Sequence, residues 1–244
     1  MKFLVCISNV PDTTTKIVFA DSKGLNPAGV QFIINPYDEI ALTRALEIKE
    51  ALGGTVTVIN VGGAGTEPNI RKALAIGADD GIRVTAEPTD AYFVAAQIAE
   101  VVKKNQYDVI LTGRESIDYN GAQVAGMLAE MLGMASVTVA TKLDIAGTEA
   151  TLEREIDGGK EIVAVALPFI ASAQKGMSEP RIPNMRGIMT ARTKPLQVLE
   201  PVASDALTAS VAYELPPAKQ ACKMISPDNV AELVDLLHSE AKVI

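Results

Sequence analysis

Short apolar runs alternate with amphipathic segments over the first 133 residues, and this alternation restricts the fold more than any other feature. Strands are predicted at residues 3–8, 55–61, 81–84 and 108–112, and helices at 36–52, 67–76 and 90–104. The run Thr55–Val61 is almost continuously β-branched, as strands buried on both faces of a parallel sheet usually are. The order therefore predicts an α/β chain in which helices cover both faces of a Rossmann-like parallel sheet.

The stretch 108–133 is the centre of this pattern. The apolar run Asp108–Thr112 is followed by polar, turn-forming residues, and the spacing of the apolar residues predicts an amphipathic helix from Gly121. The unpaired N–H groups and the positive dipole at a helix start suit a phosphate. The small residues Gly121, Ala122, Ala125 and Gly126 allow a ligand to come close to the backbone. An ordinary strand-to-helix connection explains the same spacing, because no glycine fingerprint marks a phosphate site here.

A second helix start lies at Asn35, which suits an N-cap, with Pro36 at the first helical position and Asp38 in the first turn. Ligands bind at the carboxyl ends of the strands in open α/β sheets. We therefore expect the loops after Ser8, Val61 and Thr112 to meet the Asn35 helix start at one cleft. Before that helix, residues 15–19 and 30–34 are predicted to pair as a hairpin around a turn at 21–29.

After Gly133 the apolar pattern changes to period two. Antiparallel strands are predicted at 136–145, 151–156 and 161–167, and residues 170–173 can form one more strand. The basic segment 176–195 that follows is either a solvated loop or a surface that contacts a partner. The chain thus adds an antiparallel hairpin sheet to the parallel one.

The last part of the chain has a different character. Residues 200–227 contain Pro201, Pro216, Pro217 and Pro227 and little periodicity, so an extended arm is predicted. Residues 228–242 form an amphipathic pattern that predicts a terminal helix, which packs either against another subunit or back on its own domain. The predicted domains are 1–200, which includes the basic segment, and 201–244, which forms the arm and the helix.

Charge and composition exclude several classes of function. The formal net charge is −8 and the pI is near 4.8, so attraction to nucleic acid or to an anionic membrane is not expected. Cys6 and Cys222 are too far apart for a metal motif, and His238 is the single histidine, which argues against a zinc site and a Ser-His-Asp enzyme. No apolar run reaches the length of a membrane helix and the N-terminus lacks a signal peptide, so a cytoplasmic protein without membrane insertion is expected.

Several motifs, in order, resemble the β subunits of electron transfer flavoproteins over essentially the whole chain. These are Val10-Pro11-Asp12, Asn35-Pro36-Tyr37-Asp38, Arg71–Asp79, Leu152–Glu161 with Leu167-Pro168, and Glu179-Pro180-Arg181. Two positions depart from the family pattern. Leu152 stands where a smaller aliphatic residue is usual, and Ala171 stands where a large one is expected.

The resemblance implies a Rossmann-like fold of the adenine nucleotide α-hydrolase type and an electron carrier that is not an enzyme by itself. It implies a heterodimer in which the α subunit holds most of the FAD, the β subunit completes that site, and the β subunit binds AMP. It also implies acyl-CoA or other flavin dehydrogenases as donors and an electron transfer flavoprotein–quinone oxidoreductase-like protein as acceptor.

Position by position, the resemblance implies nucleotide contacts at four places in the chain. These residues are Cys6; Asn35, Pro36, Tyr37, Asp38; Val61; and Asp118, Tyr119, Asn120, Gly121, Ala122, Gln123, Val124, Ala125, Gly126, Met127, Leu128 and Ala129. The loop residues from Asn120 to Gln123 would offer amides to the phosphate, whereas Asp118 would shape the loop or contact the ribose. The resemblance also implies an apolar anchor for dehydrogenases at Met185, beside Arg186.

Other functions stay open at this point. Bifurcating members of the family hold a second FAD in place of AMP, and Ala122-Gln123-Val124 leans to their pattern while Tyr119-Asn120 matches neither. An ATP-binding regulator of the universal-stress type would share the α/β core, but residues 134–244 argue against it. An adenylating enzyme would need a glycine-rich phosphate loop after the first strand, and Ser8–Asp12 is not one.

Overall fold

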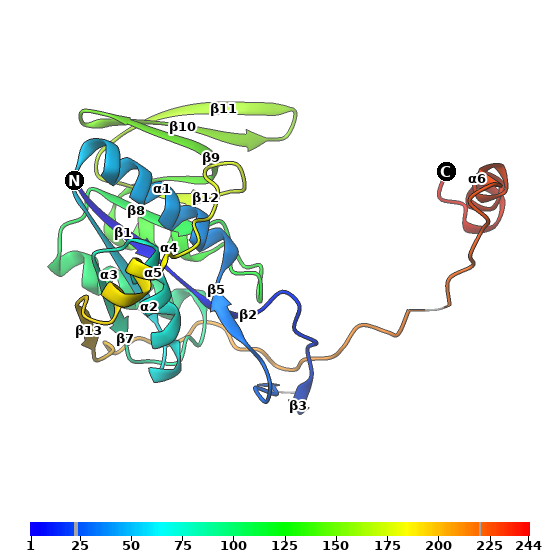
Figure 1. Ribbon diagram of the computed structural model, residues 1–244, viewed down its shortest axis with the longest axis horizontal. Coiled ribbons are helices and arrows are strands. Elements are labelled where there is room, and N and C mark those ends of the chain that lie inside the picture. The colour runs from blue at the N-terminus through cyan, green and yellow to red at the C-terminus, as the bar shows by residue number, and fades with distance from the viewer. Residues whose placement is uncertain (22–23, 220) are drawn as a thin grey trace.

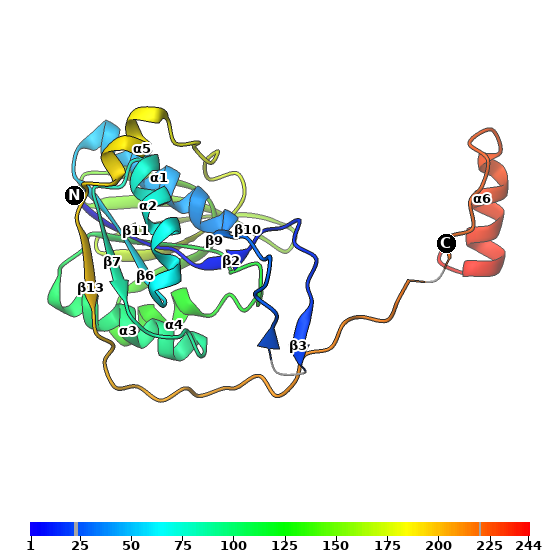
Figure 2. The same ribbon diagram turned by 60° about the horizontal axis from the view of Figure 1, so that its bottom comes forward.

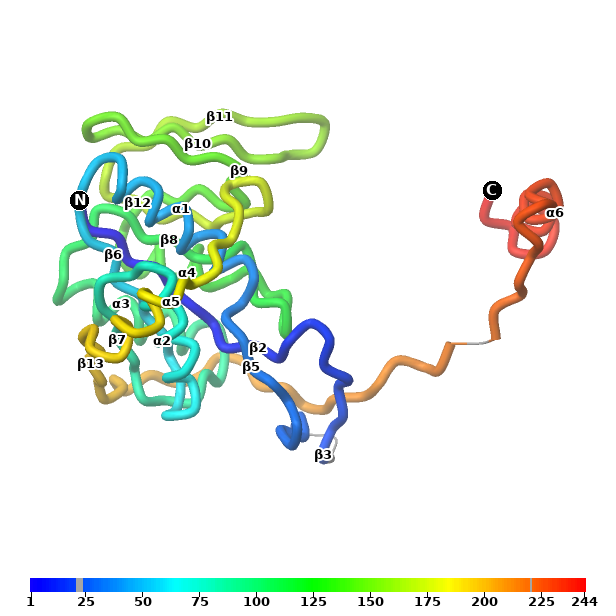
Figure 3. The backbone as a smooth tube through the Cα atoms, viewed as in Figure 1, coloured from blue at the N-terminus to red at the C-terminus, as the bar shows by residue number. Residues whose placement is uncertain are grey.

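A computed structural model describes residues 1–21, 24–219 and 221–244 (Figures 1 and 3). Within these residues, nine strands form one sheet in the order β11-β10-β9-β12-β8-β1-β6-β7-β13. Their bounds are β1 Lys2–Cys6, β6 Thr55–Val61, β7 Asp80–Val84, β8 Val109–Gly113, β9 Ala135–Ala146, β10 Glu149–Ile156, β11 Gly159–Ala166, β12 Phe169–Ala173 and β13 Leu196–Leu199. In the order of the sheet, all neighbours from β9 through β12, β8, β1, β6 and β7 to β13 pair in parallel. Strand β10 pairs antiparallel with both β9 and β11. The predicted α/β architecture is confirmed.

Helices cover both faces of this sheet (Figure 2). The first face packs α1 (Pro36–Leu52) and α2 (Glu67–Ile76) against strand residues such as Phe3 and Val5. The other face packs α3 (Ala91–Lys104) and α4 (Val124–Leu132) against Leu4 and Ile110. Successive strand residues thus face opposite layers, which is why the strands read as continuous apolar runs.

Helix α4 begins three residues later than predicted, at Val124 instead of Gly121. Asn120 and Ala122 both have φ near 51°, in the left-handed region that a right-handed helix excludes. The short turn α5 (Met185–Ala191) was also missed, because it lies in the segment 176–195 that was read as a loop.

The segment before α1 folds differently from the single hairpin predicted. Residues 15–18 lie outside any strand; β2 (Asn9–Pro11) pairs with β5 (Phe32–Ile34), and β3 (Phe19–Asp21) pairs with β4 (Gly24–Leu25). Asp12 turns the chain early, since its Oδ1 accepts hydrogen bonds from the N–H and the hydroxyl of Thr14. The predicted turn at 21–29 includes residues 22 and 23, which lie outside the described residues.

The antiparallel strands are not a separate sheet. The 12-residue strand β9 pairs in parallel with β12 through its first half and antiparallel with β10 through its second half. The hairpin β10–β11 therefore extends the main sheet at one edge. At the other edge, β13 pairs in parallel with β7, a strand that the sequence pattern did not reveal.

The chain leaves the body after β13 as an extended arm and ends in α6 (Val230–Leu236), with a π-helical turn η2 at Leu237–Ala241 (Figure 1). The predicted arm and terminal helix are thus present. No residue of α6 in the described chain is buried. Among the described residues, the model contains no helix both long and apolar enough to span a bilayer.

Candidate functional site

The chain order changes direction at β1, and we call the region at the carboxyl ends of β1 and β8 the crevice, since a ligand crevice is expected at such a point. From β1 the chain crosses to β6 and β7 on one side, whereas β8 and then β12 lie on the other side. Connections at the carboxyl ends of β1 and β8 therefore run to opposite faces of the sheet, and such a switch point is where open α/β sheets bind ligands.

Asp38, in the first turn of α1, joins the ends of these two strands. Its Oδ2 accepts the N–H of Ser8 at 2.7 Å and its Oδ1 accepts the N–H of Gly113 at 2.8 Å. The carboxyl is buried, and this burial raises its pKa to about 7, although the hydrogen bonds from Ser8, Asn35 and Gly113 act in the opposite direction. Asp38 thus fixes the start of α1 against the switch point.

Gly113 is required by this contact. A Cβ at Gly113 would lie 2.4 Å from Asp38 Oδ1 and 2.7 Å from the Cβ of Tyr37. The next residue, Arg114, places its guanidinium 5.3 Å from the centre of the Tyr37 ring. The predicted residues Tyr37 and Asp38 are therefore packed directly on the end of β8.

Asn35 stands at the N-cap of α1 as predicted, but its side chain makes no capping hydrogen bond within the described residues. Its Nδ2 donates to the carbonyl of Glu115 at 2.8 Å and its Oδ1 accepts from the N–H of Ile117 at 3.3 Å. Asn35 is completely buried. Its amide thus holds the first half of the loop that follows β8, and this role replaces the capping role expected from the sequence.

The second half of that loop, residues 118–123, is exposed. Asn120 donates its N–H to the carbonyl of Ser116 at 2.8 Å, and Tyr119 is 68% exposed with its hydroxyl 3.1 Å from that of Tyr213. The hydrogen bond with Tyr213 raises the pKa of Tyr119 to about 12. Gln123 makes no side-chain cap to α4 within the described chain, so the first N–H groups of that helix are left for water or a ligand.

The floor of the crevice is apolar. Cys6 and Val61 belong to one buried cluster with Ala125, Leu128 and Ala129 of α4. Val124 and Met127 pack against this cluster from the side. Burial, with a smaller contribution from Asp38, raises the pKa of the Cys6 thiol, so it offers an uncharged surface.

The start of α4 combines open space, an apolar floor and backbone amides without a side-chain cap. A Cβ added to Gly121 or Gly126 would meet open space, so the start of α4 has room beside it. Apolar side chains line the floor, as a purine ring requires, and backbone amides at a helix start suit a phosphate. Within the described residues, no three His, Cys, Asp or Glu side chains come together as a metal site.

The two residues predicted to contact a partner lie away from this crevice. Met185 and Arg186 are in α5, where Gly187 packs on the carbonyl of Ala75 at the C-terminal end of α2. The crevice lies at the end of the sheet where α2 begins. The predicted residues therefore form two sites, not one.

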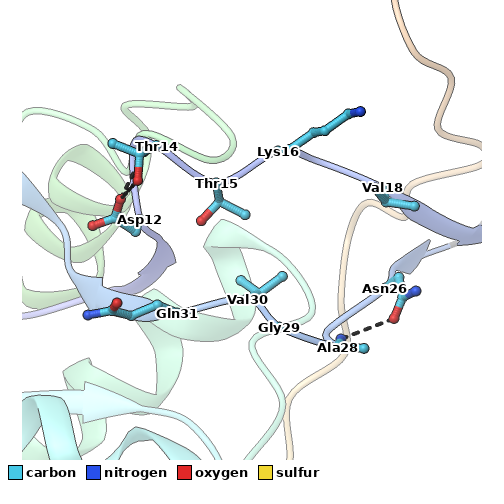
Figure 4. A pocket seen from close by; sticks show the side chains of 10 residues that line it. All are labelled: Asp12, Thr14, Thr15, Lys16, Val18, Asn26, Ala28, Gly29, Val30 and Gln31. Atoms are coloured by element: carbon cyan, nitrogen blue, oxygen red, sulfur yellow. Dashed lines mark hydrogen bonds between the residues drawn. The ribbon is translucent and has the colours of Figure 1, made fainter.

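A separate hollow of about 450 Å³ lies between the two chain segments that precede α1, and Figure 4 shows the side chains that line it. Hydroxyl, amide and charged side chains such as Thr14, Gln31 and Lys16 line most of it. It contains none of the predicted site residues. Asp12 and Thr14 meet at its rim, where they form the turn described above.

Several residues of the crevice were missed by reasoning from the sequence. Ser8 and Gly113 donate backbone N–H groups to Asp38, Arg114 supplies a cation against Tyr37, and Tyr213 comes from the arm. A glycine and an arginine directly after the apolar run 108–112 were the available signal for two of them. Nothing in the sequence pattern pointed to Tyr213.

Comparison with known proteins gives a consistent result. The family model of the electron transfer flavoprotein domain matches residues 24–204. The chain is 38% identical to the electron transfer flavoprotein subunit beta of Bacillus subtilis (strain 168), with all of both chains covered. It is 39% identical to the protein of that name from Syntrophomonas wolfei, over 91% of this chain and 88% of the relative. The corresponding human subunit is 32% identical, over 97% of this chain and 98% of its own.

Proposed function

The chain belongs to the electron transfer flavoprotein family as a β subunit, and we propose that it binds AMP in the crevice between β1 and β8 while completing the FAD site of an α subunit. Subunits of this family transfer electrons in association with a flavin and an α-type partner, and they are not catalytic enzymes. FAD, when bound, supplies the redox chemistry. The residues of this chain would bind AMP and help to orient the FAD.

The observation that carries the AMP proposal is the closure of the switch point by Asp38. This contact holds Asn35–Asp38 and the end of β8 at fixed positions beside the apolar floor. The adenine would lie on Cys6 and Val61, and the amides from Asn120 to Gln123 would bind the phosphate with help from the dipole of α4. Asp118 is exposed at the loop's outer side and suits a ribose hydroxyl better than a phosphate, because like charges repel.

The proposal for partner docking concerns α5. Ile182, Met185 and Met189 are 91%, 75% and 69% exposed, and Arg186 and Arg192 are exposed beside them. An adaptable apolar group with a basic rim suits the acidic surface of a flavin dehydrogenase. Electrons would pass from such a dehydrogenase, of the acyl-CoA or a related type, to a quinone-linked oxidoreductase.

The proposed domain division places residues 1–200 in the nucleotide-binding domain and residues 201–244 in an arm and helix that pack on the α subunit. Support comes from the exposed apolar side of the terminal helix, where Val230, Leu233 and Val234 are open to solvent. An unpartnered apolar helix face in a long arm is typical of a segment that is buried by another chain.

The test is to co-express the chain with its α subunit, purify the complex, and identify the released nucleotides by mass and absorbance. One FAD and one AMP per heterodimer is the expected result. The absence of any adenine nucleotide other than the shared FAD would contradict the AMP site. Failure of an α subunit to co-purify would contradict the heterodimer.

A second FAD in place of AMP is the alternative, as in the bifurcating members of the family. The exposed ring of Tyr119 favours it, because that ring is free to stack on a flavin at the mouth of the crevice. Two FAD and no AMP in the same experiment would establish this alternative. The universal-stress regulator is not retained, since the relatives match this chain through residues 134–244 as well.

A further inference from the structure

The first half of the extended arm is fastened to the body at three points (Figure 2). At the first point, the buried side-chain amide of Gln97 in α3 bonds to both backbone groups of Val202. Its Nε2 donates to the carbonyl at 2.9 Å and its Oε1 accepts from the N–H at 2.8 Å. This pairing replaces the strand partner that the arm loses where β13 ends.

The second point is Asp90, the N-cap of α3. Its Oδ1 accepts from the N–H of Phe93 at 2.7 Å, which caps the helix. Its Oδ2 accepts from the N–H groups of Leu207 and Thr208 at 2.7 and 2.8 Å. One carboxylate therefore caps α3 and holds the arm at the same time.

The third point is Tyr213, which meets two aromatic residues from other segments. Its ring stacks on Phe19 of β3 with 5.4 Å between centroids and 30° between planes, and its hydroxyl lies 3.1 Å from that of Tyr119. On either side, Val211 and Leu215 are 88% and 58% exposed. Among the described residues, Tyr213 is the last of the arm with a side-chain hydrogen bond to the body, and beyond it the chain continues toward α6 (Figure 1).

This contact falls on the part of the proposed nucleotide site that most needs support. Asn120 and Ala122 hold left-handed conformations, which cost free energy and persist only when surrounding contacts impose them. Asn35 holds the loop at Glu115 and Ile117 but does not reach residues 118–123. For that second half, Tyr119–Tyr213 is the side-chain contact with a distant segment among the described residues.

We infer that residues 201–213 are a strap whose Tyr213 orders the loop 118–123 and so slows release of the nucleotide from the crevice. The inference rests on the proposed function. Ordering a loop before the ligand arrives removes that cost from binding. By linkage, a bound nucleotide strengthens the attachment of the strap by the same factor by which the strap raises the equilibrium affinity for the nucleotide. This attachment fixes the point from which residues 214–244 depart toward the partner subunit.

The test measures release of labelled AMP from the purified complex after dilution into excess unlabelled AMP. Tyr213→Ala removes both the stacking and the hydrogen bond, and about tenfold faster release is expected. The matched control is Val211→Ala, which shortens an exposed side chain of the same arm and is expected to release AMP at the wild-type rate. Heterodimer yield and shared FAD content are measured for both variants to show that folding and assembly are intact.

A double-mutant cycle isolates the hydroxyl contact. Tyr119→Phe and Tyr213→Phe are each expected to speed release about threefold, and the double variant also about threefold, since both remove the same hydrogen bond. Additive effects would contradict the contact, and equal release from the wild type and Tyr213→Ala would overturn the strap. If the wild-type complex carries a second FAD at this site, its release is measured in the same way. A wild-type complex with neither nucleotide would instead overturn the proposed function.

Discussion

The two walls of the crevice are built in opposite ways. On the α1 side, Asn35 and Asp38 are buried, and each forms two hydrogen bonds with residues outside the helix. On the other side, residues 118–123 are exposed and include two left-handed non-glycine residues. The α1 wall is positioned by buried polar groups whose hydrogen bonds are made within the protein. The loop wall depends on a contact from the arm.

Because of this difference, the position of a ligand and the choice of ligand would depend on different walls of the crevice. A buried, satisfied wall costs several kcal/mol to disturb, as an order of magnitude, because its polar groups lose their partners. An exposed loop can change its shape at little cost, so sequence differences there can change which nucleotide is held without altering the fold. Under the proposed function, the α1 wall would set where the nucleotide lies, and the loop would decide how tightly it is held.

The largest expected effect is that of Gly113→Ala on the α1 wall. Its Cβ would lie 2.4 Å from Asp38 Oδ1 and 2.9 Å from the backbone carbon of Tyr37, which cannot move without shifting α1. We expect a loss of about 3 kcal/mol in the free energy of unfolding, measured by urea denaturation. Gly121→Ala in the loop is the control, because its Cβ meets open space, and a change beyond ~0.5 kcal/mol there would remove the contrast between the walls.

The second prediction concerns pH and the buried carboxyl of Asp38. Burial raises its pKa from 3.8 to about 7, so the folded chain holds this proton more tightly than the unfolded chain. Its stabilising contribution is complete below about pH 4 and is lost as the pH rises through about 7. Asp38→Asn cannot titrate, so from about pH 4.5 to about pH 8 the stability of the wild type relative to this variant is expected to fall by about 3 kcal/mol.

Urea denaturation at a series of pH values measures this difference. Gln123→Ala on the exposed loop removes no ionisable group and is the control, and the same comparison with wild type is expected to stay flat over that range. If the stability difference between wild type and Asp38→Asn does not change with pH, the prediction is contradicted. The two N–H donors, and not burial, would then set the pKa of the Asp38 carboxyl.

Asn35→Ala is expected to have a smaller effect. It removes the hydrogen bonds to Glu115 and Ile117 and leaves a partly buried carbonyl and N–H without partners. About 2 kcal/mol of stability is expected to be lost. Gln123→Ala, an exposed amide in the loop wall, should cost less than ~0.5 kcal/mol. Equal losses in the two variants would show that the loop wall is as firmly held as the α1 wall.

The smallest effect is of opposite sign. Ala122→Gly relieves a left-handed alanine at φ 51°, and the gain outweighs the added freedom of glycine in the unfolded chain. We expect stabilisation of about 0.5 kcal/mol by the same assay. Ala96→Gly, within α3, should destabilise by ~1 kcal/mol. If Ala122→Gly also destabilises, the loop is not strained and its need for a strap is gone.

Much of the fold could be predicted because it is governed by local rules. The strand Thr55–Val61 and the helix Glu67–Ile76 match the predicted bounds. A β-branched run favours a strand and amphipathic spacing favours a helix, and both patterns are visible within a few residues. The start of α4 was placed too early because small residues fit a helix and a loop equally well. Strand β13 was missed because four residues at an edge carry little pattern, and β7 supplies their pairing.

The candidate site was predicted less completely. Resemblance indicated Asn35 and Asp38, but the sequence suggested only a helix cap and a favourable first-turn charge. Their hydrogen bonds run to Glu115, Ile117, Ser8 and Gly113, up to 82 residues away. Local pattern cannot reveal such partners, because they meet only after the sheet is assembled.

The sequence by itself determined the alternation of strands and helices, the family, and the carboxyl-end location of the crevice, since these follow from hydrophobic periodicity and ordered motifs. The tertiary structure alone decided which side of the crevice is held by buried hydrogen bonds, that α5 lies at the far end of α2, and that Tyr213 of the arm reaches the loop 118–123. The physical reason is that burial and hydrogen bonding between distant segments depend on the assembled sheet, whereas the preference for strand or helix is already present in each short stretch of chain.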